Sequence, residues 1–176
     1  MIKTTKIETP LGDMIAGATD EGVCLLEFCD RKSLPTEYKD LANLLSTTLE
    51  DGKNSHLNSL HMQLTEYFEG KRKKFTLSLV TPGSKFQQEV WKELLNIPFG
   101  STRSYHDQAA ALMKPDSVRA VANANGMNRI SIIVPCHRVI GSDGHLTGYG
   151  GGLKRKKWLL DHELKYSGKE FDLSLF

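Results

Sequence analysis

The pattern of the sequence changes after residue 28, and this change constrains the fold more than any other feature. Residues 3–28 alternate β-forming residues with turn signals at 10–12 and 20–22, which is typical of strands joined by hairpins. Beyond residue 37 the apolar residues recur at three- and four-residue intervals, which is typical of amphipathic helices. We therefore predict an α/β chain, with a small N-terminal antiparallel sheet plus helices followed by a mainly helical C-terminal part.

The first part of the chain is predicted to continue with two helices and one more strand. Residues 37–50 and 55–69 are the predicted helices. The basic run at 71–74 predicts a solvated turn, and the β-forming residues at 75–80 predict a strand. Thr-Pro-Gly-Ser at 81–84 is the best candidate for a linker between two parts of the chain.

A helix-turn-helix pattern follows a helix that begins near Ser84. Ser104 and Asp107 form a capping box at the start of its first helix, and Pro115 ends that helix before a second one begins. The outward face of the second helix carries Arg119, Ala120, Asn123 and Ala124, and the inward face carries Val118, Val121, Ala122 and Asn125. The small outward side chains fit close approach to a groove of nucleic acid, and they equally fit an ordinary surface helix.

Composition and charge narrow the class of protein. No apolar run approaches the roughly 20 residues of a membrane span, and the N-terminal stretch has no apolar signal segment. Three scattered cysteines indicate a reducing, cytoplasmic setting and give no evident metal site. Residues 1–83 carry 10 Lys/Arg against 12 Asp/Glu, whereas residues 84–176 carry 13 against 9. The basic second half is compatible with a polyanionic partner.

Cys136 lies within Ile-Val-Pro-Cys-His-Arg-Val-Ile-Gly, after a β-branched run that predicts a strand ending at Pro135. A reactive cysteine requires a group that lowers its pKa or removes its proton, and His137 is adjacent. The histidine would in turn need an orienting group, and a helical carboxylate such as Glu163 is of the right type. The Cys-His pair alone leaves two interpretations open: a nucleophile, or a core thiol beside a surface histidine.

Tyr149 is embedded in glycines at 148 and 150–152. Such density lets the backbone approach a ligand closely and adopt positive φ. This loop could form the wall of a pocket for a flat aromatic group, or it could simply be flexible. The helix predicted after it begins with a run of cations at 154–157, which suits phosphates but also solvent.

Four motifs together resemble the O6-alkylguanine-DNA alkyltransferase family. They are Phe-Gln-Gln-Glu-Val-Trp with the residues that follow it, Val-Arg-Ala-Val followed by an asparagine, the segment around Pro-Cys-His-Arg, and Gly-Tyr-Gly-Gly-Gly with the basic helix after it. The resemblance covers residues 81–165, and it favours the nucleophile interpretation of Cys136. It implies irreversible, single-turnover repair of O6-alkylguanine in DNA by transfer of the alkyl group to the protein. O4-alkylthymine is a further substrate that the resemblance leaves open.

The resemblance also implies a role for each matching residue. For catalysis these are Cys136 as alkyl acceptor, His137 as base through a water, Glu163 as its orienter, Tyr149 on the departing base, and Asn128 as a brace. For DNA binding they are Arg119, which replaces the flipped nucleotide in the stack, with Tyr105, Ala120, Asn123 and Arg138. For the substrate pocket they are Val139, Gly150, Gly151 and Lys156.

The domains implied by the resemblance are a ribonuclease-H-like α/β domain over 1–82 and a DNA-binding, alkyl-accepting domain over 83–176. It further implies a monomer that uses the minor groove of alkylated DNA, with no cofactor, no metal and no membrane partner. Two residues depart from the family pattern. Arg129 stands where proline is frequent and is expected to change the bend there slightly, with an added phosphate contact and no loss of activity. Gly150 stands where some relatives carry serine and is expected to widen the pocket.

Three other functions remain as alternatives at this stage. A recognition module that flips the base without repairing it would lack the acceptor cysteine, and Cys136 is present. A sequence-specific regulator would use the helix-turn-helix for base readout, which the small side chains of its second helix do not favour. A cysteine hydrolase would leave the helix-turn-helix without a role.

Overall fold

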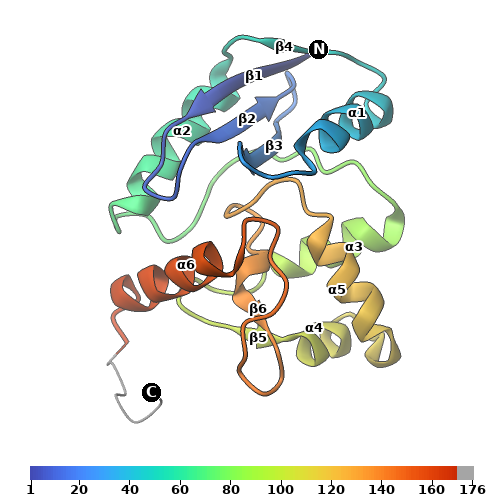
Figure 1. The fold of residues 1–176 in the computed structure, drawn as a ribbon, viewed down its shortest axis with the longest axis vertical. Coiled ribbons are helices and arrows are strands. Elements are labelled where there is room, and N and C mark those ends of the chain that lie inside the picture. Colours follow the sequence, from blue (N-terminus) through green and yellow to red (C-terminus); the bar gives the residue numbers. More distant parts are fainter. Residues whose placement is uncertain (170–176) are drawn as a thin grey trace.

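The computed structural model describes residues 1–169, and Figure 1 shows a small sheet at one end of the molecule and a group of helices at the other. The strands β1 (Ile2–Ile7), β2 (Met14–Ala18) and β3 (Val23–Phe28) pair antiparallel, as predicted. A fourth strand, β4 (Leu49–Asp51), adds to the edge of β1 in parallel, so that the order is β3-β2-β1-β4.

Helices α1 (Leu34–Leu44) and α2 (Ser55–Phe68) belong to this sheet layer, and α2 packs against β2 and β3. The predicted helix over 37–50 is therefore wrong at its end, because the chain leaves the helix to supply β4. The predicted strand over 75–80 is also wrong. Only one bridge forms there, between Val23 and Leu79. The side chains of Phe75 and Leu77 pack against the core, although their backbone joins no sheet.

The helical part contains α3 (Lys85–Leu94), α4 (Tyr105–Ala111), α5 (Val118–Gly126) and α6 (Leu153–Tyr166). Capping boxes begin α3 at Ser84 and α4 at Ser104, and the second of these confirms the predicted pair with Asp107. A short 3₁₀ turn over Pro115–Ser117 joins α4 to α5. In the expected outward face of α5, Arg119, Ala120 and Asn123 are exposed, but Ala124 is buried in the core.

The β-branched run before Cys136 does not form the predicted strand. Ile130 makes a single bridge to Leu26 of β3, and the next residues turn, with Ile132 at a φ of 73°. That φ is unusual for a β-branched side chain, and the surrounding core has to impose it. The short strand of this region instead follows the cysteine: β6 (Val139–Ile140) pairs in parallel with β5 (Arg103–Ser104).

The two parts of the molecule share one hydrophobic core. Leu26 donates its N–H to the carbonyl of Arg129 and accepts from the N–H of Ser131, each at 2.9 Å, so the sheet is bonded directly to the segment that leads to Cys136. Buried side chains from β2, β3, α2, α3, α5 and α6 belong to a single cluster. Within residues 1–169 no helix is long and apolar enough to cross a membrane.

The angle between α4 and α5 is held by a pair of buried amides. Gln108 and Asn125 each donate to the other, at 2.9 Å and 2.7 Å. Replacing Gln108 by alanine leaves the Asn125 amide without its partner in a buried place, so we expect the free energy of unfolding in urea to fall by about 2 kcal/mol. Gln88→Ala, which removes an exposed glutamine from α3, is the control and should change it far less. Equal losses of unfolding free energy in the two variants would contradict a stabilising role for the buried amide pair.

Candidate active site

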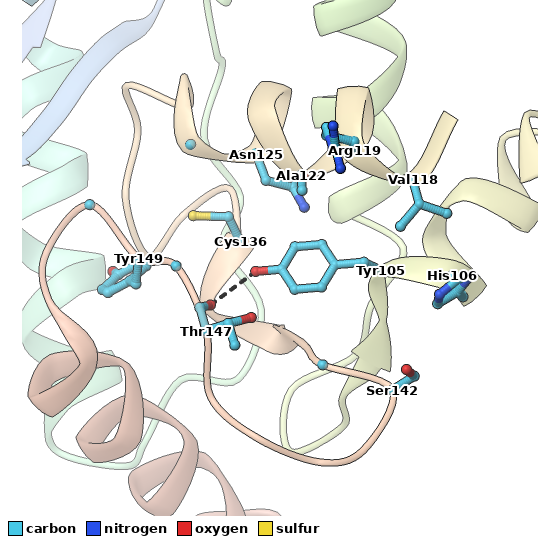
Figure 2. Close-up of a pocket in the computed structure, with 14 residues that line it drawn as sticks. Tyr105, His106, Val118, Arg119, Ala122, Asn125, Cys136, Ser142, Thr147 and Tyr149 are labelled. Atoms are coloured by element: carbon cyan, nitrogen blue, oxygen red, sulfur yellow. Dashed lines mark hydrogen bonds between the residues drawn. The ribbon is translucent and has the colours of Figure 1, made fainter. Parts of the chain in front are cut away.

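A cavity of about 700 Å³ opens between α4, α5 and the loop over residues 141–150. Figure 2 shows Cys136 at its inner end, with Tyr105 reaching in from α4 and Arg119, Ala122 and Asn125 placed along α5. Tyr149 lies on the loop side of the cysteine. The second helix of the helix-turn-helix therefore runs along the mouth of the cavity that contains the candidate nucleophile.

Asn128 holds the cysteine in place. Its side-chain amide donates to the carbonyl of Val134 at 2.9 Å and to the sulfur of Cys136 at 3.4 Å, and its carbonyl oxygen accepts from the N–H of Ile130. This geometry agrees with the bracing role expected for Asn128. Burial raises the pKa of the Cys136 thiol above its ordinary value, and the hydrogen bond from Asn128 only partly opposes this. At neutral pH the sulfur is therefore a thiol and needs a base.

His137 and Glu163 meet directly. The Nε2 atom of His137 lies 2.7 Å from Oε1 of Glu163, and both side chains are fully buried. Burial lowers the pKa of His137, although the carboxylate beside it opposes the shift. Burial alone would raise the pKa of Glu163, but His137 and Arg138 hold it well below its usual range. A neutral imidazole that donates from Nε2 to an ionised carboxylate keeps Nδ1 as an acceptor, and Nδ1 has no partner among the described residues.

Arg138 was expected to contact DNA, and the structure places it elsewhere. Its guanidinium is buried and donates twice to Glu163, at 2.9 Å each, and once to the carbonyl of Ile97 at 2.7 Å. Arg129 was expected to contact a DNA phosphate, and its guanidinium is likewise turned into the protein. That side chain is also buried and donates to the carbonyl of Pro82 at 3.0 Å. Both guanidinium groups are thus bound inside the protein.

Two further donors to Glu163 could not be found from the sequence. The hydroxyl of Tyr67, on α2 of the sheet layer, donates to Oε1 at 2.8 Å, and the N–H of Gly100 donates to Oε2 at 3.3 Å. Tyr67 lies 96 residues from Glu163 and is completely buried. The helical periodicity of 55–69 marks it only as a core residue, and no local motif identifies its hydroxyl.

The wall of the cavity opposite α5 is held by Lys156. Its ammonium group is buried and donates to three carbonyls, those of Val139, Thr147 and Gly148. The hydroxyl of Tyr105 donates to the same Thr147 carbonyl at 3.0 Å. Lys156, predicted as a pocket residue, therefore supports the loop from behind, whereas Tyr105 reaches both the loop and the cavity.

Tyr149, Gly148 and Gly150 line the cavity, whereas Gly151, predicted as a pocket residue, does not. The Tyr149 hydroxyl is buried without a partner among residues 1–169, and burial together with the nearby Cys136 raises its pKa well above the ordinary value. At Gly151, a Cβ atom would lie 2.7 Å from the ring of Phe28. At Gly150, it would lie 2.5 Å from the guanidinium carbon of Arg31. Glycine at position 150 was expected to widen the pocket, but the Arg31 guanidinium occupies the space that the missing side chain would leave.

The predicted site residues thus fall into three groups. Cys136, Tyr149, Gly150, Tyr105 and Arg119 line the cavity. A second group lies buried behind it, with His137, Glu163, Asn128, Val139 and Lys156 as members. Ala120 and Asn123 are exposed on α5 and do not line the cavity.

Within the described residues, no three His, Cys, Asp or Glu side chains are grouped closely enough to hold a metal ion.

Comparison with known proteins matches both parts of this architecture. The family model described as "6-O-methylguanine DNA methyltransferase, DNA binding domain" matches residues 85–165, and the one described as the "ribonuclease-like domain" of the same enzyme matches residues 2–81. A methylated-DNA–protein-cysteine methyltransferase of Mycobacterium tuberculosis is 54% identical over 114 residues, which cover 65% of this chain and 68% of the relative. The constitutive enzyme of that name from Bacillus subtilis is 41% identical over 166 residues, 94% of this chain and 97% of the relative.

A solved structure of Mycobacterium tuberculosis OGT in complex with DNA superposes with a TM-score of 0.78 at 39% identity, covering 94% of this chain and 93% of that one. The fold and the site define a protein that presents a half-buried thiol beside a helix-turn-helix. The chain belongs to the 6-O-methylguanine DNA methyltransferase family. Its activity is direct reversal of DNA damage, in which an alkyl group passes from O6-alkylguanine to a cysteine of the protein.

Removing the Tyr67 hydroxyl tests its contribution to the site. Tyr67→Phe deletes one donor to Glu163 without changing the packing of the ring, so the carboxylate holds His137 less firmly. We expect the rate of alkyl transfer in a single turnover to fall about three- to tenfold, since one hydrogen bond to a charged group is lost. Tyr38→Phe removes a half-buried hydroxyl elsewhere in the sheet layer and is the control. A wild-type rate for Tyr67→Phe would mean that His137 and Glu163 need no support from α2.

Proposed function

We propose that Cys136 accepts the alkyl group, once per molecule. Among the three cysteines it alone lines the cavity beside α5. Cys24 is buried in a separate core cluster with Leu25 and Leu41, and Cys29 is exposed. The product is a thioether, and no group in the described site offers a route to reverse it. The protein therefore acts as a stoichiometric reagent.

The proposed reaction begins with transfer of the thiol proton to Nδ1 of His137 through a water. Glu163 stabilises the imidazolium that forms, because its carboxylate is ionised and lies 2.7 Å from Nε2. The thiolate attacks the alkyl carbon, so a bond forms from sulfur to carbon as the bond from carbon to O6 breaks. The electron pair stays with guanine, and the Tyr149 hydroxyl, which is buried without a partner among the described residues, donates to the departing base.

DNA binding is proposed to place the damaged nucleotide in the cavity. The O6 atom of guanine is inaccessible within the base stack, so the nucleotide must rotate out at a cost of a few kcal/mol. Arg119 is exposed at the mouth of the cavity and can fill the gap left in the stack. The small exposed residues Ala120 and Asn123 let α5 approach a minor groove closely. Tyr105 would crowd the rotated nucleotide from α4.

The organisation of the chain completes the proposal. We assign an N-terminal ribonuclease-H-like domain to 1–82 and the DNA-binding, alkyl-accepting domain to 83–176, of which 170–176 lie outside the described residues. A cytoplasmic monomer that needs no cofactor is the expected working form. Val139 and Gly151 are assigned to the base-reading wall through their backbone, and Lys156 to its support.

Intact mass after mixing with a duplex that contains one O6-methylguanine tests the acceptor directly. We expect the wild-type protein to gain one methyl group and no more, because no step regenerates the thiol. Cys136→Ala should gain none, and Cys29→Ser, which removes the exposed cysteine, should behave as wild type. A wild-type protein that binds the duplex tightly but never changes mass would instead be a recognition module.

The dependence of the rate on pH tests the role of His137. Because the pKa of Cys136 is raised, an unassisted thiol gains thiolate about tenfold per pH unit across the neutral range. Because the pKa of His137 is lowered, its imidazole is already neutral there and removes the proton at every such pH. Between about pH 7 and 8.5 we expect a nearly flat single-turnover rate for wild type and a steep rise for His137→Asn. If the rates of wild type and His137→Asn rose with pH at the same slope, His137 would be excluded as the base.

A further inference from the structure

Arg31 belongs to the sheet layer and contacts three segments of the chain, two of which line the cavity. It lies in the loop after β3, and its side chain is 15% exposed. One guanidinium nitrogen forms an ion pair with Glu27, and Nε lies 3.2 Å from Glu37. The other terminal nitrogen donates at 3.0 Å to the carbonyl of Gly126, the last residue of α5. Arg31 therefore holds the end of the helix that faces DNA.

Glu27, the counter-charge of Arg31, is completely buried. It accepts from the N–H of Phe28 at 3.0 Å and from the hydroxyl of Ser131 at 3.3 and 3.4 Å. Ser131 stands in the turn that leads to Cys136. Burial raises the pKa of Glu27 to about 7, and Arg31 opposes this shift, so the carboxylate depends on Arg31 for its charge at neutral pH.

The third connection is steric. A Cβ atom added at Gly150 would lie 2.5–2.7 Å from the three terminal atoms of the Arg31 guanidinium, closer than any real contact of that kind. Gly150 itself lines the cavity, and Tyr149 precedes it. A side chain at position 150 would therefore force either the loop or the guanidinium to move, and the contacts of Arg31 with Glu27 and Gly126 hold the guanidinium in its place.

We propose that Arg31, anchored by Glu27, is a positioning residue of the alkyl pocket: it sets the distance between the end of α5 and the loop that carries Tyr149, and it imposes glycine at position 150. This inference rests on the proposed function of the cavity. Arg31 does not line the cavity, so it acts through Gly126 and Gly150. Only a planar, forked guanidinium can bind Glu27 and the Gly126 carbonyl at once.

An ordinary structural ion pair would affect stability alone, whereas a positioning residue changes the reaction. The proposal therefore predicts coupling between Arg31 and position 150. In the wild-type background Gly150→Ser drives a side chain into the guanidinium and displaces the loop, so the rate of methyl transfer at saturating duplex should fall about tenfold or more. In the Arg31→Ala background the same substitution should have much less effect, because the space is free.

The experiment measures methylation of Cys136 from an O6-methylguanine duplex in single turnovers, over a range of duplex concentrations. The variants are Gly150→Ser, Arg31→Ala and the double variant. The maximal rate and the half-saturating concentration are obtained separately, and we expect the loss to fall mainly on the maximal rate. Lys32→Ala removes the same charge from the exposed neighbouring residue and is the control. Equal fold-losses for Gly150→Ser in both backgrounds, or a wild-type rate for Gly150→Ser, would overturn the proposal.

Arg31→Ala leaves Glu27 buried and unpaired, so the variant could fail to fold. The background Glu27→Gln/Arg31→Ala removes both charges and serves in its place. The thermal midpoint of every variant is recorded, and Gly150→Ser should lower it more with Arg31 present than without it. This second measurement needs no reaction. If the wild-type protein is never methylated, the proposed function fails, and the thermal coupling still decides whether Arg31 and Gly150 compete for one space.

Discussion

The carboxylate of Glu163 is the group on which the site depends, because it is charged, completely buried and bound by donors from three separate segments of the chain. A buried ion of this kind costs several kcal/mol unless its surroundings pair it fully. Arg138 supplies the opposite charge, and Tyr67 and Gly100 supply neutral donors. Together they keep Glu163 ionised, and in the proposed reaction an ionised Glu163 orients His137 and stabilises its protonated form.

Burial of Cys136 has the opposite consequence for its own charge. The thiol is kept neutral by desolvation, and a neutral thiol reacts poorly with electrophiles that are not held beside it. Low reactivity toward other electrophiles is an advantage for a thiol that, in the proposed function, can react only once. In the proposed reaction the proton leaves through His137, which is fixed beside the cavity by Glu163.

The sheet layer is part of the site and does more than support the helices. Tyr67 reaches Glu163 from α2, and Arg31 reaches the end of α5 from the loop after β3. The direct bonds between Leu26 and the segment at 129–131 fix how these two residues approach the cavity. The His137–Glu163 pair and the walls of the cavity are therefore both set by contacts between segments about a hundred residues apart in sequence.

The sequence by itself determined what depends on local pattern and residue type. Turn signals predicted the antiparallel hairpins of the sheet, the capping box at Ser104 predicted the start of α4, and the Pro-Cys-His-Arg segment marked the proposed nucleophile and its neighbour. Hydrophobic periodicity could not tell the β-branched run before Cys136 from a strand, and the core turned it instead, with Ile132 at positive φ. Only the tertiary structure decided that Arg138 points inward, that Tyr67 completes the carboxylate's shell and that Arg31 fills the space beside Gly150. These depend on contacts between distant segments, and local spacing carries no information about such contacts.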